Sequence, residues 1–118
     1  MKCEELDVWK RSATLSSEIY LELSMCKDYG FKDQITRSGL SIPSNIAEGL
    51  ERNSDKDTLR FLDYARASSA ELQTQIYIGI KINYIDKKIG LAWIREIKEL
   101  SKMTNSLMRS IKNLTTKD

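Results

Sequence analysis

The sequence predicts an all-α fold: a single domain over residues 1–118, in which four antiparallel helices follow an up-down-up-down order. Three observations favour this fold. Apolar residues recur every three or four positions in four successive stretches, which is the period of a helix with one buried face. The chain has one proline and five glycines, and 41% of its 118 residues are hydrophobic. A chain of this length and composition can bury one core and has few interruptions.

The first helix is expected over residues 7–25 and the second over residues 33–52. Asp7 stands at the start of the first apolar stripe and is the expected N-cap, because its carboxylate can accept from the free amides of the first turn. A polar break follows that helix, and Gly30 is the expected point of reversal.

Pro43 lies in the middle of the second expected helix. A proline lacks the amide that would donate to the carbonyl four residues back, and its ring crowds that carbonyl. The residue four back is Gly39, which has no side chain and can absorb the distortion. We therefore predict one helix that is kinked at Pro43. The alternative is a loop through Gly39 followed by a short helix capped by Ser41.

The third helix is expected over residues 55–83 and the fourth over residues 87–114. Ser54, followed three residues later by Asp57, is close to a capping box for the third helix. Alternating isoleucines over residues 76–82 are also compatible with a strand, but the helical apolar seam continues through them. The fourth helix carries its apolar residues in a heptad pattern.

The chain contains no histidine. This argues against the di-iron centres of helical bundles, serine–histidine triads and most zinc hydrolase sites. The glycines do not form a phosphate-binding loop. Cys3 and Cys26 flank the first helix, too far apart for a disulfide, and two cysteines without histidine make no plausible zinc site. We therefore expect a non-enzymatic protein with no metal and no cofactor.

The amino terminus lacks the apolar stretch of a signal peptide. No apolar run approaches the roughly 18 residues that a membrane span requires. We therefore expect a cytoplasmic protein without a membrane segment.

The net charge is only +2, but residues 60–118 hold 11 Lys and Arg against 6 Asp and Glu. In the fourth helix five cations occupy one arc of about 100°, nearly opposite the apolar seam. These cations are Arg95, Lys98, Lys102, Arg109 and Lys112. They span about 25 Å of helix axis and could lie beside several phosphates without reading bases. The alternative is an ordinary solvated face, in which Glu96 and Glu99 dilute the positive charge.

A second polar group lies on the second helix. Glu48 and Arg52 are four residues apart with the acid first, which is the favourable order for a helical ion pair. The other members of this group are Arg37, Ser44 and Asn45, with Glu71 and Gln75 on the third helix as possible partners across the bundle. The group could bind a ligand or a partner protein. Alternatively, it could be a buried network that fixes helix register where the proline frees a carbonyl.

Residues 76–85 place isoleucine or tyrosine on nearly every side of the third helix. One four-helix core covers only one stripe of each helix. The remaining surface, drawn from Tyr77, Ile78, Ile80 and Tyr84, is therefore expected to meet another chain. The alternative is a wide core face with a few scattered exposed apolar residues.

The run Ser41-Ile42-Pro43-Ser44-Asn45-Ile46-Ala47-Glu48-Gly49 resembles the signature of the four-helix-bundle proteins called 23S ribosomal RNA intervening-sequence proteins. Three further pieces fit in order, so that the similarity spans about residues 6–85. These are Leu6-x-Val8-Trp9, Arg60-Phe61-Leu62 and Glu71-Leu72-Gln73-Thr74-Gln75-Ile76. Family members usually have two adjacent basic residues in the middle of the second helix. This chain has Thr36-Arg37-Ser38 there, so only Arg37 carries over.

The resemblance implies a non-enzymatic bundle that forms homopentameric rings. Relatives of the family include the accessory variability protein of diversity-generating retroelements, a basic pentamer that associates with a reverse transcriptase and nucleic acid. The first hypothesis is therefore a small oligomeric scaffold associated with RNA or a nucleic-acid enzyme. Phosphate contacts would come from Arg37, Arg52 and the cations of the fourth helix. The alternative is a purely protein-binding or structural homo-oligomer, which the low net charge favours.

Overall fold

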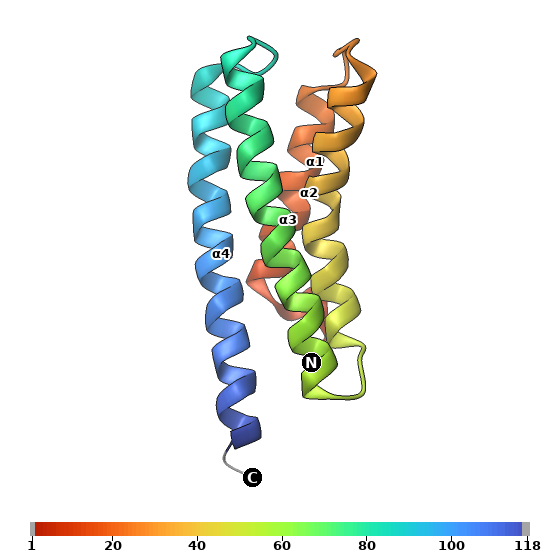
Figure 1. Cartoon of the computed structure of the whole chain (residues 1–118), viewed down its shortest axis with the longest axis vertical. Coiled ribbons are helices and arrows are strands. Elements are labelled where there is room, and N and C mark those ends of the chain that lie inside the picture. The colour runs from red at the N-terminus through yellow and green to blue at the C-terminus, as the bar shows by residue number, and fades with distance from the viewer. Residues whose placement is uncertain (1, 117–118) are drawn as a thin grey trace.

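The structure is a computed structural model that describes residues 2–116, and within this range it contains four α-helices and no strand. A short 3₁₀ turn, η1 (Cys3–Glu5), precedes them. The helices are α1 (Asp7–Glu22), α2 (Tyr29–Leu50), α3 (Asp55–Lys81) and α4 (Lys87–Thr116) (Figure 1). The prediction of an all-α fold with four helices is confirmed.

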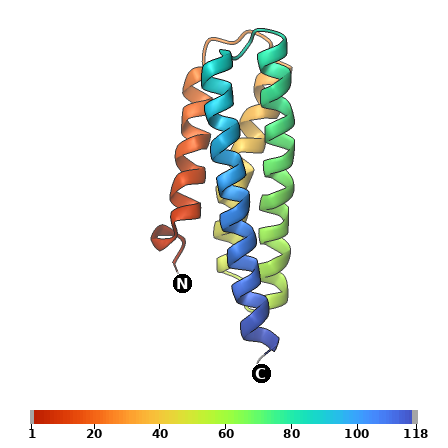
Figure 2. The same cartoon turned by 90° about the vertical axis from the view of Figure 1, so that its left-hand side faces the viewer.

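The helices form a closed ring of neighbours, since α1 packs on α2, α2 on α3, α3 on α4 and α4 on α1, whereas the described backbones of the diagonal pairs lie farther apart. Figure 2 shows α4 in front, between α1 and α3, and the chain reverses its direction at each connection. The result is a rod of about 51 × 21 × 20 Å. The final turns of α4 extend past the ends of its neighbours (Figures 1 and 2).

The core follows the predicted stripes, one from each helix. Its members are mostly aliphatic and almost wholly removed from solvent, and burying each large aliphatic side chain contributes about 1.5–3 kcal/mol. The most deeply buried are Ile19 and Leu23 at the end of α1, Ile35, Ile42 and Ile46 of α2, Leu62, Leu72 and Ile76 of α3, and Ile97 and Leu100 of α4.

Two local predictions at the start of the chain are wrong. Asp7 is the first residue of α1 rather than its N-cap, which is Leu6 and makes no side-chain capping bond. Gly30 lies inside α2 rather than at a reversal, because Asp28 caps the helix by accepting from the Phe31 amide at 3.1 Å. The second helix therefore begins four residues earlier than expected.

Ser54 caps α3 as predicted, with its hydroxyl oxygen 3.2 Å from the Asp57 amide. The helix ends at Lys81, two residues before the predicted end, because Asn83 adopts a left-handed conformation with φ of 64°. The amide of Tyr84 then donates to the Gly79 carbonyl at 2.9 Å, which closes the helix with the geometry of a Schellman motif. The strand alternative for residues 76–82 is wrong.

Pro43 lies inside a continuous α2, and both Pro43 and Ile46 are buried. The alternative of a loop through Gly39 is therefore wrong. Gly39 faces α1, where an added Cβ would lie 3.8 Å from the Cα of Ser16. The kink at Pro43 stays a prediction.

The α1–α4 seam is the least extensively packed of the four, and a bidentate ion pair crosses it. The Arg11 guanidinium donates through Nε to Glu96 Oε2 at 2.9 Å and through Nη2 to Glu96 Oε1. Its Nη1 also lies 3.5 Å from the sulfur of Met103. The hydrogen bond from Arg11 lowers the pKa of Glu96 below its ordinary value, against the opposing effect of desolvation.

Gly79→Ala tests the packing at the end of α3. An added Cβ would lie 2.5 Å from Cδ1 of Ile85 and 3.0 Å from the Phe31 ring. We expect the free energy of unfolding to fall by about 1–2 kcal/mol in urea titrations, because overpacking outweighs the gain in helix propensity. Gly30→Ala is the matched control, since its Cβ would meet nothing closer than 3.7 Å. Destabilisation by both variants alike would contradict the packing described.

Glu96→Gln tests the seam through its pH dependence. A carboxylate whose pKa is lowered on folding stabilises the fold above its unfolded pKa, and this contribution is lost as the pH falls through the folded value. We expect the variant to be up to about 1 kcal/mol less stable than the wild type at pH 7, since the pair is partly exposed. The difference should vanish once Glu96 is protonated. Urea titrations at pH 7 and pH 3 measure this, with Glu22→Gln as control, and an unchanged difference at low pH would contradict it.

Candidate nucleic-acid interface

The outer face of α4 presents the predicted basic arc to solvent. The heptad pattern directs Trp93, Ile97 and Leu100 into the core, so the opposite side of the helix must face outward. All five predicted cations, Arg95, Lys98, Lys102, Arg109 and Lys112, are exposed. The name "basic face" is used below for these five residues.

One of the two acids expected to dilute this charge is directed elsewhere. Glu96 turns toward α1, where Arg11 neutralises it. Only Glu99 remains exposed beside the arc without an ion pair among the described residues. The basic face is therefore more strongly positive than the count of charges along α4 suggests.

Arg66 of α3 lies beside the carboxyl-terminal part of the basic face. Its Nη1 donates to Asn105 Oδ1 at 3.0 Å, and its Nη2 pairs with Asp63. A shallow polar hollow of about 240 Å³ lies here, between Arg66, Asn105, Met108, Arg109 and Lys112. The sequence pattern does not single out Arg66, because its proximity to Arg109 arises only when α3 and α4 pack together.

Arg37 lies on α2 and Arg52 two residues beyond its end, and both are away from the basic face, since no described backbone position of α2 comes close to α4. Each forms an ion pair with an acid four residues earlier: Arg37 with Asp33 at 2.9 Å and Arg52 with Glu48 at 2.6 Å. The Arg52 guanidinium also lies 4.3 Å from the centre of the Phe61 ring. The structure thus divides the predicted cations into two separate groups.

The predicted polar group around residues 37–52 also divides. Asn45 donates to both the carbonyl and the hydroxyl oxygen of Ser41, each at 2.8 Å, and the Ser41 hydroxyl lies 2.8 Å from that of Ser68 on α3. This short chain joins the two helices on either side of Pro43, and of the predicted group only Asn45 takes part in it. Whether the group fixes helix register stays a prediction.

The other members of that group lie outside this chain. Ser44 is exposed. Glu71 is also exposed and lines a shallow hollow of about 290 Å³ together with Arg37 and Ser68. Gln75 is partly buried, and its Oε1 atom accepts no hydrogen bond from the described residues.

The predicted interface residues differ in exposure. Tyr77, Ile78 and Tyr84 are each more than 40% exposed. Ile80 instead packs inside the chain, where its side chain lies over Gly90 of α4. Tyr84 is anchored to the α1–α2 connection, since its hydroxyl donates to Asp28 Oδ2 at 2.9 Å and its ring meets Phe31 edge-on.

Further exposed apolar side chains lie at the same end of the rod, which is the upper end in Figure 1. They come from the end of α1, the start of α2 and the end of α3, and they are Leu21, Met25, Tyr29 and Ile82. Together with Ile78 they are called the apolar end below. Sequence periodicity alone places Leu21 and Tyr29 in different stretches, so only the packed structure shows that they share one end.

The described part of the chain contains no group of three or more potential metal ligands. None of its helices combines the length and apolar character needed to cross a membrane.

Comparison with known proteins identifies relatives. A family model described as 23S rRNA-intervening sequence protein matches residues 4–106. A crystal structure from Bacteroides thetaiotaomicron superimposes with a TM-score of 0.80 at 26% identity, covering 86% of this chain and 97% of the other. That protein is described as a member of the S23 ribosomal protein family with unknown function. No curated protein matches. On the strength of the family match over most of its length, the chain belongs to the 23S rRNA-intervening sequence protein family.

Proposed function

We propose that this protein is a non-enzymatic helical scaffold that binds RNA through phosphate contacts on the basic face of α4. The observation that carries this proposal is the exposure of five cations on one side of a single helix, with Glu96 withdrawn from them by Arg11. The name of the family supports an association with ribosomal RNA.

The mode of binding follows from the geometry. The cations rise along about 25 Å of helix axis, so they can lie beside several phosphates of one backbone. Long, exposed lysine and arginine side chains on a flat helix face bind by releasing counterions and carry little sequence information. The protein would therefore recognise RNA by its charge and shape rather than by its bases.

A structural homo-oligomer is the second candidate function. The observation that favours it is the apolar end, where five large apolar side chains are each more than 45% exposed. Large apolar side chains left exposed at one end of a molecule favour contact with another protein. The family resemblance implies that the assembly would be a homopentamer, and the two functions are compatible with each other.

The RNA proposal is tested by measuring RNA affinity. We expect a triple variant to bind a structured RNA more weakly than the wild type and to reduce the slope of the logarithm of the binding constant against the logarithm of salt concentration by about 2–3. The variant combines Lys98→Ala, Lys102→Ala and Arg109→Ala. Fluorescence anisotropy between 50 and 200 mM salt measures both quantities. The matched control combines Lys10→Ala, Lys27→Ala and Lys56→Ala, which removes the same charge from exposed positions outside α4.

Two results would contradict the RNA proposal. One is the absence of binding by the wild-type protein at 50 mM salt. The other is an equal loss of affinity in both triple variants, because that would reflect net charge rather than the basic face.

The homo-oligomer is tested by measuring the mass of the protein in solution. We expect multi-angle light scattering to give an oligomer mass for the wild type, and Ile78→Lys combined with Ile82→Lys to shift it toward the 13.6 kDa monomer. Leu114→Lys is the control, because Leu114 is exposed at the opposite end of the rod. A monomeric wild type at all concentrations would exclude the homo-oligomer.

A further inference from the structure

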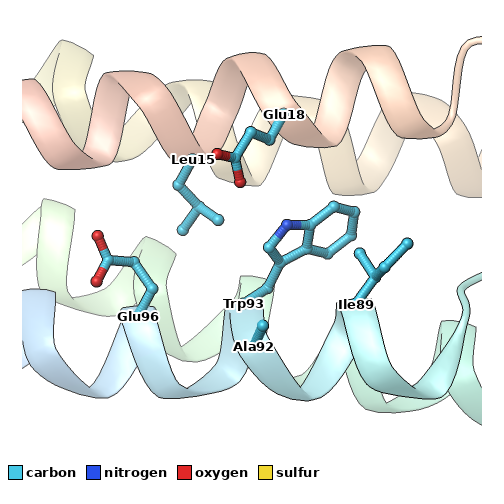
Figure 3. A pocket seen from close by; sticks show the side chains of 6 residues that line it. All are labelled: Leu15, Glu18, Ile89, Ala92, Trp93 and Glu96. Carbon is cyan, nitrogen blue, oxygen red and sulfur yellow. The ribbon is translucent and has the colours of Figure 1, made fainter.

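A cavity of about 350 Å³ opens in the α1–α4 seam, beside the Arg11–Glu96 ion pair. Its walls come from Leu15 and Glu18 of α1 and from Ile89, Ala92, Trp93 and Glu96 of α4 (Figure 3). These six residues are called the seam pocket. The volume is at the lower end of the range for small-ligand sites, so the pocket suits a single side chain rather than a large cofactor.

Trp93 gives the seam pocket a donor that is open to solvent. The residue as a whole has a relative exposure of 5%. Figure 3 shows its indole nitrogen directed toward the space between Leu15 and Glu18. No described residue accepts a hydrogen bond from this N–H group, and the nitrogen is not among the buried polar atoms that lack a partner, so it reaches the solvent of the pocket. The open donor therefore faces a space that a ligand atom can reach.

The two acids of the seam pocket, Glu18 and Glu96, favour a positively charged ligand. Glu18 is exposed at the rim and makes no ion pair among the described residues. Glu96 is held ionised by Arg11, which lowers its pKa. Arg11 occupies one side of Glu96, so Glu18 is the carboxylate left to meet an incoming cation. The apolar floor of the pocket is formed by Leu15, Ile89 and Ala92.

We propose that the seam pocket binds an arginine side chain from an extended peptide segment of a protein partner. The aliphatic stem would lie on the apolar floor, and the guanidinium would pair with the Glu18 carboxylate. A planar guanidinium suits this role because it can donate two parallel hydrogen bonds to one carboxylate. A backbone carbonyl of the same peptide would accept from the Trp93 indole N–H.

This site is separate from the basic face. The seam pocket uses the side of α4 that faces α1, whereas Arg95, Lys98 and Lys102 lie on the outer side of the same helix. RNA on the basic face and a peptide in the seam pocket could therefore be bound together. The proposal does not depend on RNA binding.

The test follows the two tryptophan indole signals of the full ¹⁵N-labelled protein by NMR, with Trp9→Phe used to assign them. The probe is Nα-acetyl-arginine-N-methylamide, which has a guanidinium and backbone carbonyls. We expect a saturable shift of the Trp93 signal with little change at Trp9. The neutral analogue Nα-acetyl-citrulline-N-methylamide should bind about tenfold more weakly, as expected when a charge-assisted hydrogen bond becomes neutral.

Glu18→Gln should weaken binding of the arginine probe by about tenfold, whereas Glu22→Gln, an exposed position one turn along α1, should not change it. Thermal unfolding of both variants checks that the fold is retained. The proposal would be overturned by no saturable shift of Trp93, by equal binding of the two probes, or by equal effects of the two variants. A Trp93 shift that follows protein concentration without any probe would also overturn it, because a second copy of the chain would then occupy the pocket.

Discussion

Burial of one apolar stripe from each helix is the constraint on which the other features of this protein depend. Four amphipathic helices can satisfy it together only by turning these stripes toward a common axis. Once Trp93, Ile97 and Leu100 of α4 enter the core, the cations on the opposite side of that helix have no place except the surface. The candidate RNA-binding face is thus a direct consequence of core packing and needs no separate structural device.

The four seams between the helices are not equivalent. The α2–α3 seam is closely packed, with Gly49 so near α3 that an added Cβ would lie 3.2 Å from the Thr58 carbonyl oxygen. Hydroxyl and amide groups of Ser41, Asn45 and Ser68 also join these two helices. The α1–α4 seam has fewer contacts and contains a cavity beside its one described ion pair. The close seam is thus held by both packing and hydrogen bonds, whereas the open seam contains unfilled space.

Ion pairing decides which of the many charges remain available to a partner. Arg37 and Arg52 pair with acids four residues earlier in the chain, so their charge is largely compensated locally. Arg11 likewise compensates the negative charge of Glu96, which points toward α1 and not toward the outer side of α4. As a result the positive charge is concentrated on one helix face although the net charge of the chain is only +2.

The sequence by itself determined the number, type and approximate limits of the helices, most of the core residues and the exposure of the cations on α4. These properties follow from periodicity within one helix, and local spacing records periodicity directly. The sequence did not show the exact residues at which two helices begin or end. Asp28 caps α2, and the left-handed Asn83 follows the end of α3. At such positions a few side-chain and backbone hydrogen bonds compete with continued helix.

Only the tertiary structure decided which residues from different helices meet. It placed Arg66 beside Arg109. It also showed that Ile80, expected at an interface with another chain, packs over Gly90 between α3 and α4. Arg37 proved to lie far from the cations of α4. It also created the cavity between Glu18 and Trp93. The physical reason is that such contacts depend on the relative height and rotation of neighbouring helices, which are set by how their side chains interdigitate and not by the pattern along either helix.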